Sequence, residues 1–495
     1  MPRERITNIA NLASERLILL DCVDKGLSFQ TDVTEVQDRP TSPNNIPQDK
    51  LGLFRRRGSR KAVIADMELL ARFQDKKLTV PSFLEAGPRA ELRFDPHDVR
   101  AAVVTTGGVA PGLHCVIHSV VKRHCDTYSI GSSRGRIFGV YNSFQGLCTL
   151  ADSLVELTTA MTEGWLDQGG SKLGIVRYYP KDETGKDISG DAAIRKMADE
   201  ITLQLQTNRI DILYVIGGDG SLKTAHEIAV RNPTRSVVGI PKTMDNDVLW
   251  VWQSFGFDTA VEQATRVINT LHSEAEATRR ICVVELFGAE SGFVAANAAL
   301  ASGHVDAVLI PEEFKALTVD DAEQYLVKLV DHIGERVEDE DQRAHNPHAV
   351  VVVAEGVGTA LESMEASIEG AKVTKTKFVD QLKARLQAKV VDAHGKGIPV
   401  FVNQPRHHIR AVPANAHDQI YCERLGALAV DNALAGYTDC MISQWLTEFV
   451  LVPMPLVTLG KKSIPINGMF WKQVVSSTGQ PLSRAEHVSP STSAV

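Results

Sequence analysis

Seven short runs rich in valine and isoleucine, each ending in glycine or a polar residue, constrain the fold of this chain more than any other feature. The runs are RAAVVTT (100–106), IDILYVIGG (210–218), SVVGIP (236–241), RICVVELFG (280–288), DAVLIPE (306–312), HAVVVVAEG (348–356) and IPVFVN (398–403). They are almost continuously apolar, which is typical of strands buried on both faces of a parallel sheet. Helical stretches alternate with them, at 221–231, 256–273, 291–302, 318–333 and 375–389. This alternation predicts an α/β protein with two doubly wound, Rossmann-like lobes, mainly parallel sheets and right-handed crossovers.

The 495 residues are expected to divide into two lobes with an extension at each end. Residues 98–256, completed by about 409–475, form the first lobe, and residues 257–408 form the second. Residues 1–97 form an N-terminal extension that packs on the body or mediates assembly. The tail, residues 476–495, is small and polar, so it buries too little apolar surface to offset the entropy of ordering. We therefore expect the tail to be flexible.

Charge and hydropathy exclude several classes of protein. The formal net charge of −8 disfavours a binder of nucleic acid or of anionic surfaces, so any phosphate site must be local. No run reaches the roughly 18 consecutive apolar residues of a membrane span, and the N-terminus lacks the apolar core of a secretory signal. The seven cysteines are scattered and never form C-x-x-C, which predicts neither a disulfide framework nor a zinc site. We expect a cytoplasmic protein that binds neither nucleic acid nor membrane.

The residues after three of the apolar runs have the chemistry of a phosphate site, because ligands of doubly wound sheets bind beyond the carboxyl ends of the strands. After the run 100–106, Gly107 and Gly108 let backbone amides approach an anion closely, and a helix beginning after Gly112 adds its dipole. Such glycines also occur in plain tight turns, so this loop alone does not decide the function.

The run 210–218 ends in GGDGS (217–221), where Ser221 is placed to N-cap the next helix. Asp219 is either a turn aspartate or a ligand of a divalent metal that bridges it to phosphate oxygens, since a bare carboxylate repels them. The neighbouring Gly218 and Gly220 again leave the backbone accessible to an anion.

The run 236–241 continues into PKTMDND (241–247), where Asp245 and Asp247 flank Asn246. Moving a phosphoryl group to a sugar hydroxyl needs a carboxylate that takes the proton and a second polar group that holds the sugar in line. The two aspartates can divide these tasks. Together, three glycine- or acid-rich turns at the ends of three strands predict phosphoryl transfer.

In this order and spacing, GGVAPG (107–112), GGDGS and PKTMDND resemble the phosphofructokinase family over roughly residues 98–450. The resemblance implies a 6-phosphofructokinase of glycolysis, which transfers a phosphoryl group to the 1-hydroxyl of fructose 6-phosphate and gives fructose 1,6-bisphosphate. It also implies Mg²⁺ as cofactor, a homodimer or homotetramer, a first lobe that binds the phosphoryl donor and a second lobe that binds the sugar phosphate. Weaker matches are GGSKLGIVR (169–177), RRICVVELFG (279–288), AEG (354–356) and the segment 407–430.

The resemblance also implies a role for each matched residue. Asp245 is the expected general base, while Arg177 and Lys242 are expected to offset charge on the transferring phosphoryl and leaving groups. The donor-binding set is Gly107, Gly108, Gly218, Asp219, Gly220 and Ser221, of which Asp219 also serves the metal. The substrate-binding set is Thr243, Asp247, Arg280, Glu355, His407 and Arg410. Arg280 is expected to reach the active site of a neighbouring subunit.

Three positions depart from the family pattern. Ala289 stands where an arginine is usual, so one cationic group is missing, and His114 replaces an asparagine of the glycine loop. Phe401 replaces a basic sugar-phosphate residue, for which Arg406 is a candidate substitute. The carboxylates for the base and the metal are retained, so we expect altered kinetics or specificity rather than an inactive protein.

The residues that resemble donor-specific positions of the family give conflicting indications of the phosphoryl donor. Gly220 is of the ATP type, because a side chain there would occupy space near the α-phosphate. Lys242 is of the pyrophosphate type, since its ammonium can pair with the pyrophosphate leaving group, although Gly with Lys is also characteristic of the ATP enzymes of plants and trypanosomes. Lys223 and Thr224 argue against ATP, because a small glycine often leaves room for the nucleoside there.

We expect ATP as the donor, with pyrophosphate as the alternative. A second alternative is a regulatory homologue that binds the sugar phosphate and has lost catalysis, which the missing arginine at Ala289 makes credible. A nicotinamide enzyme is disfavoured, because GGVAPG lacks the G-x-G-x-x-G spacing.

Overall fold

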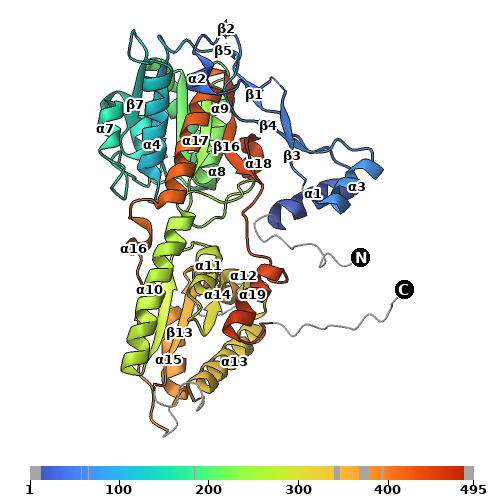
Figure 1. Cartoon of the computed structure of the whole chain (residues 1–495), viewed down its shortest axis with the longest axis vertical. Helices are drawn as coiled ribbons and strands as arrows, with labels where there is room; N and C mark the ends of the chain where they lie inside the picture. Colours follow the sequence, from blue (N-terminus) through green and yellow to red (C-terminus); the bar gives the residue numbers. More distant parts are fainter. Residues whose placement is uncertain are drawn as a thin grey trace. The chain divides into compact units, whose positions relative to one another are not determined.

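The computed structural model describes residues 13–483 except 57, 65, 183, 339–345, 367–377 and 392–394. The chain separates into two compact units (Figure 1). The large unit comprises Asn11–Ala260 and Arg410–Lys462, and the small unit comprises Met1–Ala10, Val261–Ile409 and Ser463–Val495. The N-terminal extension thus belongs largely to the large unit. Residues 463–475, expected in the first lobe, belong instead to the small unit.

The large unit is built on a nine-stranded sheet. From edge to edge its strands are β3 (Arg60–Ala62), β4 (Ser82–Glu85), β17 (Glu448–Pro453), β16 (Cys440–Trp445), β10 (Ser236–Pro241), β9 (Ile212–Gly217), β6 (Arg100–Thr105), β7 (Arg136–Val140) and β8 (Leu154–Glu156). The strands from β16 to β7 are parallel, and antiparallel strands of the extension and the C-terminal segment complete one edge. The runs at 100–106, 210–218 and 236–241 are therefore strands, as predicted.

Two short strand pairs and a set of helices complete this unit. The pairs are β1 (Thr34–Glu35) with β15 (Tyr437–Thr438), and β2 (Ser42–Pro43) with β5 (Glu91–Leu92). The helices are α1 (Ala13–Lys25), α2 (Gln48–Leu51), α3 (Met67–Asp75), α4 (Leu113–Lys122), the π-helix η3 (Arg123–Thr127), α5 (Ser143–Cys148), α6 (Leu150–Ser153), α7 (Thr159–Glu163), α8 (Gly190–Thr207), α9 (Asp219–Arg231), α17 (Ala416–Leu434) and α18 (Met454–Val457).

Helices cover both faces of the nine-stranded sheet because successive side chains of its central strands point to opposite faces. In β6, Ala101 and Val103 pack with α4 and α17, whereas Ala102 and Val104 pack with α8 and α9. Helices α4 and α17 lie side by side (Figure 1). This two-faced burial explains why the runs in the sequence are continuously apolar.

The small unit holds a four-stranded parallel sheet in the order β12-β13-β11-β14. Its strands are β11 (Ile281–Leu286), β12 (Ala307–Leu309), β13 (Ala349–Ala354) and β14 (Val400–Asn403). Its helices are α11 (Phe293–Ser302), α12 (Pro311–Phe314), α13 (Val319–Glu338), α14 (Gly356–Ala366), α15 (Phe378–Lys389) and α19 (Met469–Thr478), and α10 (Phe257–Thr278) and α16 (His407–Arg410) span the two boundaries. All four strands were predicted as strands.

The first residues of the expected tail are folded. Residues 476–478 still belong to α19, and Gln480 is 4% exposed. The Gln480 amide group accepts the Val308 amide over 2.7 Å and donates to the Val308 carbonyl over 2.9 Å, so it pairs with β12. Residues 484–495 of the expected tail lie outside the described residues.

Two expectations drawn from composition can be compared with the described residues. None of their helices is both long enough and apolar enough to cross a membrane. All seven cysteines are free thiols, and four of them are buried.

Candidate active site

The three turns identified in the sequence start side by side at the carboxyl ends of three central strands of the nine-stranded sheet. Strands β10, β9 and β6 are parallel neighbours, with Pro241 opposite Gly217 and Ile216 opposite Thr105. Their carboxyl ends therefore lie at the same edge, where doubly wound proteins bind ligands. The fold brings GGVAPG, GGDGS and PKTMDND together there.

Lys242 links two of these turns. Its ammonium nitrogen Nζ donates to the carbonyl of Gly108 over 2.5 Å, and the residue is 5% exposed. Gly107 has a φ of +77°, and a Cβ there would lie 3.1 Å from Nζ, so glycine suits both the conformation and the close approach. Burial lowers the pKa of Lys242 to about 8, an effect that the charge of Asp245 opposes. The glycine turn is thus supported by a buried amine.

The acidic motif is held together by its threonine. The Thr243 hydroxyl donates to Oδ1 of Asp247 over 3.0 Å and accepts the amide of Asp245 over 3.0 Å. Asp247 is 7% exposed, and burial raises its pKa, with a further contribution from the negative charge of Asp219. Asp245 is half-buried. The motif therefore combines a buried carboxylate, tied to the threonine, with a more accessible one.

The surroundings of Asp219 fit a divalent cation that also binds phosphate. Its charge acts on Asp247, and a cation would relieve this repulsion. Among the described residues, no group of three or more His, Cys, Asp or Glu side chains is arranged to hold a metal. Mg²⁺ usually takes one or two carboxylates and completes its shell with water and substrate phosphates. Asp219 is therefore suited to supply one of the ligands of such an ion.

Helix α9 begins earlier than predicted. Its first residue is Asp219 and its N-cap is Gly218, which makes no side-chain hydrogen bond, so the prediction that Ser221 caps this helix is wrong. The chain already turns into the helix at Gly218, which leaves Ser221 in the first turn. The amides of that turn have no partner within the helix and remain suited to an anion. Gly220 is exposed, and a Cβ there would meet no atom within 4 Å.

His114, one of the departures from the family pattern, braces the segment that leads to Arg177. Its ring nitrogen Nε2 accepts the amide of Lys172 over 2.9 Å, and Nδ1 lies 2.8 Å from the carbonyl of Gln168. Together these contacts require a neutral ring with the proton on Nδ1, and burial lowers the pKa of His114 in agreement. The exposed Arg177 follows a few residues later. His114 is thus a structural support and not a charged ligand.

Arg410, expected in the sugar-phosphate set, lies beside the glycine turn. Its guanidinium nitrogen Nη2 lies 3.4 Å from the position of a Cβ on Gly108. Its positive charge also helps to lower the pKa of Lys242. Two cations therefore act on the same turn, where an anion would be attracted by both.

The other three substrate residues belong to the small unit, and strand direction separates two of them. Glu355 follows β13, and its amide donates to the carbonyl of Leu286 at the end of β11 over 2.9 Å. Arg280 precedes β11, so it lies at the amino ends of the strands, whereas Glu355 lies at their carboxyl ends. Its guanidinium is 5.7 Å from the centroid of the Phe401 ring. His407 is exposed in α16. Arg280 and Glu355 therefore do not converge within one copy of this unit.

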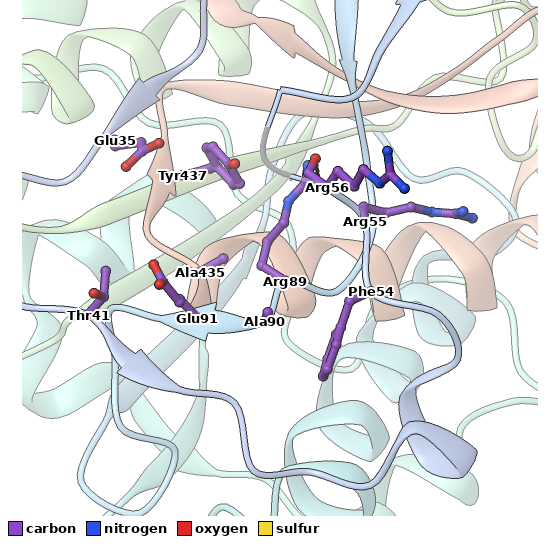
Figure 2. Close-up of a pocket in the computed structure, with 10 residues that line it drawn as sticks. All are labelled: Glu35, Thr41, Phe54, Arg55, Arg56, Arg89, Ala90, Glu91, Ala435 and Tyr437. Carbon is purple, nitrogen blue, oxygen red and sulfur yellow. Dashed lines mark hydrogen bonds between the residues drawn. The ribbon is translucent and has the colours of Figure 1, made fainter.

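The large unit contains a cavity of about 330 Å³ (Figure 2). Its walls include Phe54, Arg55 and Arg89 from the extension and Tyr437 from β15. The hydroxyl of Ser236, at the start of β10, donates to the carbonyl of Tyr437 over 2.6 Å. The cavity therefore adjoins the amino ends of the central strands, whereas the three turns follow their carboxyl ends. None of the predicted site residues is among its described walls.

A family model described as phosphofructokinase matches residues 100–433. This chain belongs to the phosphofructokinase family. The family inferred from the three motifs is thereby confirmed.

Three relatives of this phosphofructokinase are similar over most of their length. An ATP-dependent 6-phosphofructokinase of Borreliella burgdorferi is 35% identical over 81% of this chain and 85% of that protein. One of Amycolatopsis methanolica is 35% identical over 86% of this chain and 88% of that protein. ATP-dependent 6-phosphofructokinase 7 of Arabidopsis thaliana is 34% identical over 81% of this chain and 77% of that protein.

Solved structures agree on the fold. Phosphofructokinase of Saccharomyces cerevisiae has a TM-score of 0.56 and 23% identity, covering 73% of this chain and 45% of that one. The pyrophosphate-dependent phosphofructokinase of Marinobacter aquaeolei has a TM-score of 0.55 and 20% identity, covering 78% and 92%. The predicted α/β fold with mainly parallel sheets is confirmed.

Two lysines that contact the acidic motif of this phosphofructokinase were not predicted from the sequence, namely Lys461, whose ammonium lies 3.9 Å from Oδ2 of Asp247, and Lys462. Lys462 is 1% exposed, its amide donates to the carbonyl of Asp247 over 2.9 Å, and its Nζ donates to Oδ1 of Asn246 over 2.8 Å. In the sequence it is one of two adjacent lysines in LGKKS (459–463), a pattern typical of an exposed surface. No local signal distinguishes it.

Proposed function

We propose that this phosphofructokinase transfers the γ-phosphoryl group of ATP to the 1-hydroxyl of fructose 6-phosphate, giving ADP and fructose 1,6-bisphosphate. The observation that carries the proposal is the meeting of three turns at one sheet edge, where glycine amides, a buried lysine and three carboxylates lie together. ATP as donor is supported by the relatives named ATP-dependent 6-phosphofructokinase and by the open space at Gly220.

In this proposal Asp245 is the general base. Its carboxylate takes the proton of the sugar 1-hydroxyl as that oxygen bonds to the γ-phosphorus, and the bond from the γ-phosphorus to the β,γ-bridging oxygen breaks, which releases ADP. Lys242 and Arg177 offset negative charge on the phosphates, and the amides of Gly107 and Gly108 orient them. Mg²⁺ held by Asp219 would neutralise charge shared between phosphate oxygens.

The sugar phosphate is proposed to bind to the six residues of the substrate-binding set. Thr243 and Asp247 line the sugar, and Glu355 accepts one of its hydroxyls. His407 and Arg410 bind the 6-phosphate, together with Arg280 of a neighbouring subunit. The placement of Arg280 and Glu355 at opposite ends of the strands of one sheet supports a role for Arg280 outside its own copy.

The contacts of Lys223 and Thr224 weaken the argument that these two residues exclude ATP. The Lys223 ammonium pairs with Asp191 of α8 over 2.7 Å, which draws its side chain toward that helix. Thr224 is 2% exposed and donates its hydroxyl to the Gly220 carbonyl over 3.2 Å. Both side chains are therefore occupied by contacts of α9 itself or of its neighbour α8.

Steady-state kinetics with each donor test this proposal. We expect kcat/KM for ATP with Mg²⁺ to exceed that for pyrophosphate with Mg²⁺ by at least ~10-fold, with fructose 1,6-bisphosphate as the product of both reactions. The reverse order would assign the enzyme to pyrophosphate. Absence of turnover with either donor, together with retained binding of fructose 6-phosphate, would favour the regulatory homologue.

The role proposed for Arg280 predicts a symmetric oligomer. Light scattering should give a homodimer or homotetramer, and Arg280→Ala should raise KM for fructose 6-phosphate by ~10-fold or more, because a phosphate loses one charged hydrogen bond. Arg266→Ala is the control, since Arg266 is exposed and pairs with Glu262 one turn away in α10. A monomer with full activity would contradict the cross-subunit role.

A further inference from the structure

The loop that carries the acidic motif is held by one buried amine. Besides its bond to Asn246, the Lys462 Nζ donates to the carbonyls of Val251 over 2.8 Å and Trp252 over 3.3 Å. One side chain therefore binds both the beginning and the end of the stretch 246–252. Because these contacts cross the loop, moving Lys462 would change the path of the whole segment.

Asn246 connects the contacts of Lys462 to the two aspartates of the motif. It is fully buried and has a φ of +56°, a left-handed conformation that asparagine adopts more readily than most residues. Its Oδ1 accepts both Lys462 and the amide of Ser254, the latter over 3.1 Å. Since Asn246 lies between Asp245 and Asp247, its fixed backbone sets the directions in which the neighbouring carboxylates leave the chain.

The N-terminal extension supplies the larger counter-charge of Lys462, and Asp247 supplies a smaller one. Glu15 of α1 is 1% exposed and accepts the amide of Trp250, in the same loop, over 2.8 Å. Burial raises the pKa of Glu15 and lowers that of Lys462, and the attraction between the two groups opposes both shifts. Glu15 thus contacts the loop directly and also stabilises the charged form of the lysine.

We propose that Lys462 and Glu15 form a clamp that positions the acidic loop 243–252 for catalysis. Both residues lie outside residues 100–433, the part that the family model matches. The clamp is therefore supplied by segments added on either side of that core, and it gives the N-terminal extension a role at the active site. The inference rests on the proposed function, in which Asp245 is the general base.

If Lys462 and Glu15 only stabilised the fold, Tm and kcat would fall together in each single variant and recover together in the double variant. The clamp predicts that only Tm recovers. Two buried groups of opposite charge add little net stability, and neutralising only one of them is costly because the other loses its counter-charge. Removing both charges should therefore restore stability. It cannot restore the position of the loop, since Asn246, Val251 and Trp252 would still lack the donor that joins them.

The test compares Lys462→Met, Glu15→Gln and the double variant in the full-length protein. We expect Lys462→Met to lower both Tm and kcat, with kcat falling at least ~10-fold because misplacing a reacting group acts on the chemical step. KM for fructose 6-phosphate should rise as well, since Thr243 and Asp247 of the same loop line the sugar, while KM for ATP should stay nearly unchanged. The double variant should regain most of the Tm and little of the kcat. The control is Lys122→Met, which removes an exposed lysine at the end of α4 and should stay within 2-fold of the wild type.

Hydrogen exchange followed by mass spectrometry gives a readout that does not depend on turnover. Amides of residues 243–252 should exchange faster in Lys462→Met and in the double variant, but not in Lys122→Met. A double variant that recovers kcat together with Tm would overturn the clamp, as would unchanged exchange in the loop. A wild type without phosphofructokinase activity whose loop still loosens in Lys462→Met would refute the proposed function and leave the structural coupling intact.

Discussion

Asp245→Asn should lower kcat by ~10²-fold or more while the enzyme still binds fructose 6-phosphate, because the amide cannot take the proton of the sugar hydroxyl. The substitution keeps the shape of the side chain. The amide of residue 245 still donates to the Thr243 hydroxyl, a contact of 3.0 Å in the wild type. We therefore expect a thermal midpoint within a few degrees of the wild type.

Binding and turnover of this variant are measured separately, by calorimetry with fructose 6-phosphate and by initial rates at saturating ATP. The control is Asp152→Asn, which neutralises an exposed carboxylate of α6 and should change neither. If Asp245→Asn turns over within a few-fold of the wild type, another group is the base, and Asp247 becomes the candidate.

Gly220→Asp should abolish most ATP turnover and penalise pyrophosphate much less. A carboxylate at the start of α9 would face the region of the α-phosphate, where like charges repel and the added volume excludes a nucleotide, whereas pyrophosphate is shorter. Gly220 does not have a left-handed φ, and a Cβ there would meet no atom within 4 Å. The backbone thus accepts a side chain, and the loss can be attributed to the donor rather than to misfolding.

The measurement is kcat/KM for each donor, with Gly220→Ala as the control that adds a Cβ without a charge. We expect Gly220→Ala to cost ATP far less than Gly220→Asp does. Lys242 is the residue that favours pyrophosphate. Lys242→Gly tests it by removing the amine that a bare pyrophosphate needs. A wild type that uses pyrophosphate with little ATP activity, and loses it in Lys242→Gly, would contradict ATP as the donor.

The central strands were predictable because their signal is local. Burial on both faces makes β6, β9 and β10 continuously apolar, and the glycines and acids that follow them stand out against these runs. The strands β7 and β8 and the antiparallel pair β16 and β17 were missed, although they belong to the same sheet. Ser221 was wrongly assigned as a cap because a helix start depends on backbone geometry, which Gly218 permits earlier than the residue pattern suggests.

By itself, the sequence determined the family, the α/β class and the three turns that carry the chemistry, because these follow from residue order along short stretches. Only the tertiary structure placed Lys242 beneath the glycine turn, Arg410 beside Gly108, and Glu15 with Lys462 under the acidic loop. The partners of such contacts lie far apart in the chain. A hydrogen bond or charge pair of this kind depends on which segments the fold brings together, so it leaves no periodicity or spacing in the sequence.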